Sequence, residues 1–211
     1  MSPKAADPNV RTALVETAAR LLTEEGPSAL TTRRLAREVG TSTMAVYTHF
    51  GGMEELLTAI SLEGFRRLAR RLNRVKPTDD PVADVVALGR AYGRNALANP
   101  DLYRVMFGTR PDGWILDASD QAMTLGTFTT LVAAVQRCID AQRIDGDAWA
   151  IASQMWATLH GVVMLELSGF LSRTEAVHTS EAITFNLVVG LGDDPARARR
   201  SIGGTLAGIE A

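Results

Sequence analysis

Twenty residues from Thr31 to Phe50 constrain the fold more than any other part of this sequence, because they hold two short helical patterns separated by a glycine. Leu35, Ala36 and Val39 recur on one side of the first pattern, as in an amphipathic helix. Gly40 stands where that helix should end. The spacing therefore predicts two helices joined by a turn of about three residues.

Hydroxyl side chains stand where each of these helices should begin. Thr31 is the expected N-cap of the first helix and Ser42 that of the second, since each hydroxyl can accept a hydrogen bond from a backbone N–H two or three residues further on. In the second helix, Val46 and Phe50 lie four residues apart and share the inward face.

The opposite side of the second helix is rich in hydroxyl and aromatic groups, where an ordinary solvated face would carry more Glu and Lys. Its residues are Thr43, Met44, Tyr47, Thr48 and His49. A helix pair of this kind can place such side chains in the DNA major groove. The alternative is a plain helical hairpin, which also has a glycine in its turn; the outward residues favour DNA binding.

The charge distribution points the same way. Residues 1–76 contain 12 Lys and Arg against 8 Asp and Glu, a balance of +4, whereas residues 77–211 contain 10 against 16, a balance of −6. Only the N-terminal third therefore suits a nucleic acid partner.

The rest of the chain shows helical spacing throughout and no alternating strand, which predicts an all-α fold. We expect a three-helix head with the helix-turn-helix, followed by a larger helical domain. The predicted division is 1–52 for the arm and head, 53–80 for a connecting helix and linker, and 81–211 for the second domain. The helices expected outside the helix-turn-helix cover residues 9–25, 53–75, 82–98, 101–107, 116–141, 146–168 and 174–191, with a short basic tail from Ala196.

The stretch from Val10 to Leu57 resembles the DNA-binding domain of the TetR family of transcriptional regulators. The resemblance rests on Thr31-Thr32, Leu35-Ala36, Gly40, Ser42, Tyr47 and His49-Phe50, followed by Glu54-Glu55-Leu56-Leu57. It implies that Thr43, Met44 and Ala45 lie at the base edges, with Thr48 on the same outward face. It also implies that Tyr47 and His49 contact the DNA backbone, and that Thr32 and Arg33 contact phosphate.

One position departs from the family pattern. Where the family usually has a lysine at the start of the fourth helix, this chain has Met53, preceded by Gly51 and Gly52. The sequence therefore predicts that one usual phosphate contact is missing.

The C-terminal part resembles the ligand-binding domain of one subgroup of the same family. It contains the pattern W-x-x-x-H-G at Trp156 to Gly161, and the segment Leu102 to Gly108 is also similar. Trp156, His160 and Met164 lie on one helical stripe that could line a cavity. His160 could equally be an ordinary core residue. The candidate effector-pocket residues are Met106, Phe107, Trp114, Met123, Phe128, Trp156, His160 and Met164.

The resemblance further implies a ligand-responsive regulator, most simply a repressor, that binds a palindromic operator as a homodimer through its last two long helices. Met and aromatic side chains would suit a small hydrophobic effector. Activation in place of repression stays open, as do the identity of the effector and the operator sequence.

The competing class is an enzyme with chemistry in the C-terminal part. The sequence disfavours it, because it has no G-x-S-x-G, H-E-x-x-H or P-loop pattern and its three histidines are isolated. No cofactor or metal is expected. A single cysteine, Cys138, the lack of a secretory signal and the lack of a long uninterrupted apolar run predict a cytoplasmic protein without a membrane partner.

Overall fold

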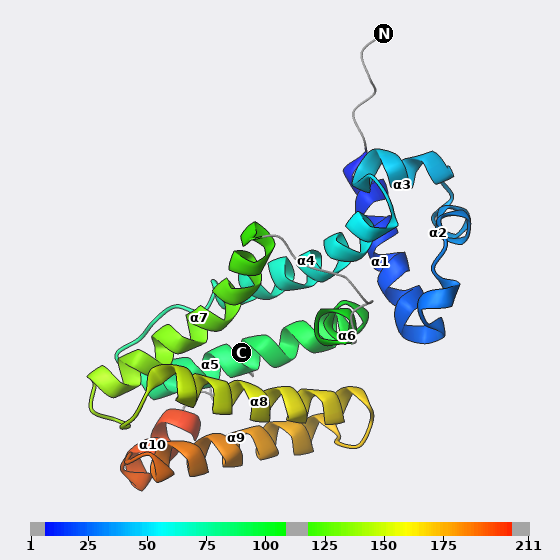
Figure 1. Ribbon diagram of the computed structural model, residues 1–211. Helices are drawn as coiled ribbons and strands as arrows, with labels where there is room; N and C mark the ends of the chain where they lie inside the picture. Colours follow the sequence, from blue (N-terminus) through cyan, green and yellow to red (C-terminus); the bar gives the residue numbers. More distant parts are fainter. Residues whose placement is uncertain (1–6, 109–117, 204–211) are drawn as a thin grey trace. The chain divides into compact units, whose positions relative to one another are not determined.

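The computed structural model describes residues 7–108 and 118–203, and within these two ranges the protein is helical with no strand (Figure 1). The all-α prediction is confirmed. The elements are α1 (Pro8–Glu25), η1 (Pro27–Ala29), α2 (Thr32–Val39), α3 (Thr43–Phe50), α4 (Met53–Leu72), α5 (Pro81–Ala98), α6 (Pro100–Phe107), α7 (Ala118–Asp140), α8 (Ala148–Leu167), α9 (Arg173–Gly190) and α10 (Pro195–Gly203).

The helix ends follow the local sequence signals closely. Gly26, with a φ of 83°, ends α1, and Ser172 begins α9 with a capping box, in which its hydroxyl accepts from the Glu175 backbone while the Glu175 carboxylate accepts from Ser172. The prediction ran α4 three residues too far, because single turns of hydrogen bonds after Leu72 continue to Val75 without extending the helix. The short 3-10 turn η1 was not predicted.

The chain divides into two compact units. The first contains residues 1–67 and 99–124, as far as they are described. In it, α1 packs against α2 and α6, and α2 packs against α3. Leu102 of α6 belongs to the same buried cluster as Leu14, Leu35 and Val46, so α6 completes the core of the helix-turn-helix head. A Cβ on Gly64 of α4 would clash with the Met106 side chain, and the glycine allows α4 and α6 to approach closely.

The second unit contains residues 68–98 and 125–211, as far as they are described. In it, α8 and α9 lie side by side, with α10 packed at one end of α9, and α5 contacts both α8 and α10 (Figure 1). Apolar side chains such as Val82, Ile151 and Val163 fill the space between these helices.

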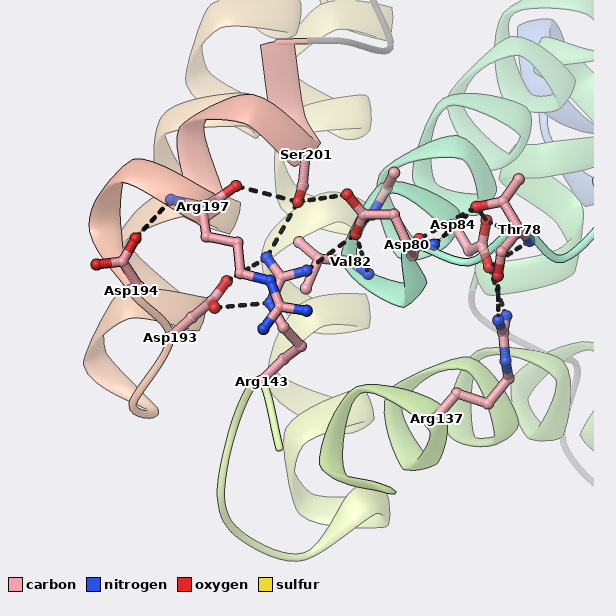
Figure 2. A network of polar contacts seen from close by, with 11 residues as sticks. Thr78, Asp80, Val82, Asp84, Arg137, Arg143, Asp193, Asp194, Arg197 and Ser201 are labelled. Atoms are coloured by element: carbon pink, nitrogen blue, oxygen red, sulfur yellow. Dashed lines mark hydrogen bonds and ion pairs between the residues drawn. The ribbon is translucent and has the colours of Figure 1, made fainter. Parts of the chain in front are cut away.

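A buried arginine joins the helix ends of this second unit (Figure 2). The Arg143 guanidinium donates two hydrogen bonds of 2.7 Å to the Asp193 carboxylate and one of 3.0 Å to Asp80. It also donates to the Ser201 hydroxyl at 3.0 Å, which in turn donates to Asp80 at 2.7 Å. Arg143 and Asp193 side chains are only 1% and 2% exposed, so this network holds the α7–α8 turn, the start of α5 and α10 together.

The two compact units do not coincide with the predicted arm and head (1–52), connecting segment (53–80) and second domain (81–211), because α6 belongs to the first unit. That division by role stays a prediction.

Candidate functional site

The helix-turn-helix forms through local capping and one left-handed glycine. The Thr31 hydroxyl accepts from the Arg34 backbone N–H at 3.2 Å and caps α2, as predicted. Gly40 ends α2 with φ 72° and ψ 33°, a conformation that glycine adopts without steric cost. Residues 40–42 form the turn, so the predicted three-residue connection is confirmed.

Ser42 corrects one detail of the sequence analysis. It occupies the N-cap position of α3 with extended backbone angles, but its side chain makes no capping hydrogen bond. Its backbone carbonyl accepts from the Ala45 N–H at 3.0 Å instead. The fold of α3 therefore rests on packing of Val46, which is fully buried, more than on a side-chain cap.

The outward face of α3 carries the side chains predicted to read DNA. Met44 is 64% exposed and Tyr47 is 51% exposed, both unusually open for large apolar side chains. Thr43 and Thr48 are exposed beside them, and the Thr48 hydroxyl donates to the Met44 carbonyl at 2.9 Å. This face is open to a partner that can accommodate both apolar and hydroxyl groups, as the base edges of a major groove can.

The other predicted DNA-contacting residues are placed differently. Arg33 is exposed and Thr32 is half-buried at the start of α2. His49 is half-buried, and Ala45 packs partly against the head core. The roles of these residues stay predictions.

The structure divides the arginines of α2 into two classes, which the sequence could not. Arg34 donates to the Glu25 carboxylate at 2.6 and 2.7 Å and to Glu38 at 3.1 Å. The hydrogen bonds to Glu25, and to a smaller extent the one to Glu38, raise the pKa of Arg34 above its usual range. Arg33 and Arg37 are exposed and appear in none of the ion pairs among the described residues. Two cations of this helix are therefore available to phosphate.

A second candidate region lies within the second unit and centres on Tyr92 of α5. The Trp156 indole N–H donates to the Tyr92 hydroxyl at 3.3 Å, and that oxygen lies 3.3 Å from His160 Nδ1. Burial lowers the pKa of His160, which favours its neutral form. Phe128 and Trp149 extend the aromatic group, with the Phe128 ring centroid 6.1 Å from Trp156 and 5.4 Å from Trp149.

Sequence reasoning missed Tyr92. The signal was the glycine pair Gly89 and Gly93 on either side of it, which face Leu159 and Val163 of α8 and allow α5 to approach that helix. A tyrosine beside such a close approach is well placed to contact α8.

The predicted effector-pocket residues fall in both units. Met164 lies half-buried on α8, with Phe128, Trp156 and His160 in the same unit. In the first unit, Met106 is 2% exposed and Phe107 packs edge-on against Phe65 and Tyr103, so these two side chains fill a core. Met123 is half-buried in that unit, and Trp114 lies outside the described residues.

Comparisons with known proteins decide the family. Residues 14–60 match the profile described as bacterial regulatory proteins, tetR family, and residues 85–188 match a tetracyclin repressor-like C-terminal domain. An uncharacterized HTH-type transcriptional regulator of Mycobacterium tuberculosis, Rv0681, is 30% identical over 80% of this chain and 76% of its own length. The chain belongs to the TetR family of transcriptional regulators.

Further relatives of this TetR-family regulator agree. Tetracycline repressor protein class C of Escherichia coli is 32% identical over 52% of the chain and 50% of the repressor. A solved structure of a protein with unknown function from Rhodococcus sp. RHA1 is 29% identical, with a TM-score of 0.74 over 92% of this chain and 100% of that one. The protein is thus a DNA-binding transcriptional regulator and not an enzyme.

By length and composition alone, α7 is the one helix of the described residues that could cross a membrane, with a mean hydropathy of 1.2. A single helix of this kind is weak evidence for a span, and α7 also carries Thr127, Thr129 and Thr130. The family instead implies a regulator that works on DNA.

Proposed function

We propose that this regulator is a ligand-responsive repressor that binds a palindromic operator as a homodimer in the cytoplasm. The observation that carries the proposal is the open face of α3, where Met44 and Tyr47 stand exposed beside Thr43 and Thr48. A single helix reads only a few base pairs, so two copies spaced about 34–36 Å apart, or a multiple of that distance, would read a two-fold symmetric site.

Within this proposal each predicted residue has a role. Thr43, Met44 and Ala45 contact base edges, and Thr48 lines the same face. Tyr47 and His49 contact the DNA backbone, while Thr32 and Arg33 bind phosphate at the start of α2. Phosphate contacts of this kind fix the register of the protein on the duplex.

The dimer would form through α8 and α9. Leu165 is 45% exposed on α8 and Phe170, in the turn between the two helices, is 80% exposed. Exposed apolar side chains of this size, on α8 and in the turn that leads to α9, suit burial against a second copy.

The effector would bind in the second unit, near Tyr92, Trp156 and His160. The rings of Tyr92, Trp156 and Phe128 offer an apolar surface. The Tyr92 hydroxyl and the His160 imidazole supply polar groups that can orient a ligand, a combination typical of small-molecule sites. A hydrophobic effector would act by preferring one of two conformations that differ in operator affinity. The assignment to the W-x-x-x-H-G subgroup is part of the same proposal.

The direct test is fluorescence anisotropy with DNA from the region upstream of the protein's own gene. Tyr47→Ala should weaken operator binding about 10-fold or more, because it removes a hydrogen bond to a charged phosphate, worth roughly 1.5–3 kcal/mol. Leu125→Ala, which truncates an α7 side chain of similar exposure (50%), is the matched control and should bind as the wild type does. Equal affinities for the two variants would contradict the assignment of α3 as the reading helix.

A further inference from the structure

Arg11 is an arginine of the head that belongs neither to the helix-turn-helix pattern nor to the W-x-x-x-H-G pattern. It lies in the second turn of α1, and its guanidinium carbon stands 5.0 Å from the ring centroid of Phe50, within cation–π range. Phe50 is the last residue of α3 and packs against the buried head core. The ring is therefore fixed, and it holds the Arg11 side chain at the C-terminal end of the recognition helix.

Two other arginines of the head are neutralised by carboxylates, whereas Arg33 and Arg37 of α2 are not. Arg20 pairs with Glu24 and Glu38, and Arg34 pairs with Glu25 and Glu38. Arg11 forms no ion pair with any carboxylate of residues 7–108 and 118–203. Its charge is positioned by an aromatic ring and is not compensated by an acid of the described residues, so it is available to an external anion.

The start of α4, which follows Phe50 directly, has no cation of its own. Met53 packs against the head core, and the first turn continues with the exposed carboxylates of Glu54 and Glu55. These acids would repel a DNA strand that approached α3 from this end. Arg11 is a cation held beside this junction, through its contact with Phe50.

We propose that Arg11 binds a phosphate of the operator backbone, next to the C-terminal end of α3, and so supplies the positive charge that Met53 does not. The guanidinium can donate two parallel hydrogen bonds to one phosphate while the Phe50 ring limits its side-chain freedom. The contact carries no base specificity, so it strengthens binding to operator and unrelated DNA alike. This inference rests on the proposed function, in that the open face of α3 reads the operator.

The test is the salt dependence of operator affinity for wild type, Arg11→Gln, Arg11→Lys and Arg66→Gln. Each phosphate contact contributes about 0.9 to the slope of log affinity against log salt concentration. Arg11→Gln should lower the magnitude of that slope by about one unit and weaken operator and unrelated DNA by a similar factor. Arg11→Lys keeps the charge and should keep the wild-type slope.

Arg66→Gln is the matched control, because it removes the same charge roughly 20 Å further along α4 from Met53. Its slope should equal that of wild type. Circular dichroism melts would confirm that all variants are folded. Equal slopes for Arg11→Gln and Arg66→Gln would overturn the proposal, as would an equal loss of slope in Arg11→Lys and Arg11→Gln. A wild type that binds no DNA specifically would instead contradict the proposed function, and this contact with it.

Discussion

His160 shows how one residue can serve either a core or a site. It is half-buried, its Nδ1 lies 3.3 Å from the Tyr92 hydroxyl, and burial lowers the pKa of its imidazole. The sequence left both interpretations open, and the structure adds the polar partner that the sequence could not identify. A neutral imidazole beside a hydroxyl can accept or donate one hydrogen bond, which suits the orientation of a polar group on an effector.

The lowered pKa of His160 predicts a pH-dependent stability. The unfolded chain binds a proton near the ordinary pKa of 6.5, whereas the folded state resists protonation until lower pH. The free energy of unfolding should therefore fall as pH decreases below about 6.5 and level off below the folded pKa. Urea denaturation of wild type and His160→Gln between pH 7.5 and 5 measures this, and the variant should lose less stability over that range.

His178→Gln provides the comparison for that experiment, because it removes an exposed imidazole from α9. A His160→Gln profile that runs parallel to the wild type at every pH would show that protonation of His160 is not coupled to folding.

At the scale of elements, the helices follow from sequence and their partners do not. Caps and glycines such as Thr31, Gly40 and Ser172 fix the ends of helices because each acts on its own backbone neighbours. Ser42 shows the limit of that logic, since it holds the cap position without the capping bond. The partners of Tyr92 and Arg143 could not be identified from sequence, because their contacts join residues 50 or more positions apart, and only Gly89 and Gly93 hinted at the place of Tyr92.

The Arg143 network should dominate the anchoring of α10 (Figure 2). Arg143→Met leaves the Asp193 carboxylate buried without its bidentate partner, and loss of one member of a buried ion pair costs about 3–5 kcal/mol. The expected result is a lower urea midpoint with an unchanged m-value.

Arg173→Ala is the matched control for Arg143→Met. Its pair with Glu166 spans 3.3 Å, and the arginine is 51% exposed although the Glu166 side chain is only 8% exposed. Solvent reaches one side of this pair, so the change should cost less than the loss of a fully buried partner. A similar small loss in both variants would mean that the buried network adds little to the stability of the fold.

At the scale of the whole molecule, the proposed dimer can be tested through Phe170 and Leu165. A charge on this face would be buried without a partner in the complex, at a cost of several kcal/mol. The double variant Leu165→Glu/Phe170→Glu should therefore sediment as a monomer at micromolar concentration and lose operator affinity, while its helical circular dichroism stays intact.

Ser168→Glu introduces charge in the same turn at an exposed polar position and serves as the control. A dimer that persists in the double variant would place the interface on other helices.

The contribution of α6 to the first unit has a consequence for recombination between regulators. The N-terminal segment that carries α1, α2 and α3 lacks Leu102, which reaches the same core from about fifty residues beyond the end of α3. A chimera that exchanges residues 1–52 alone would pair a foreign head with the native α6. The core of its head would then combine side chains from two different proteins, and these would not be matched in packing. If α3 reads the operator as proposed, its specificity would be transferred most safely by grafting the exposed residues Thr43, Met44 and Thr48 onto α3 of a host regulator and leaving the packing residues of that host in place.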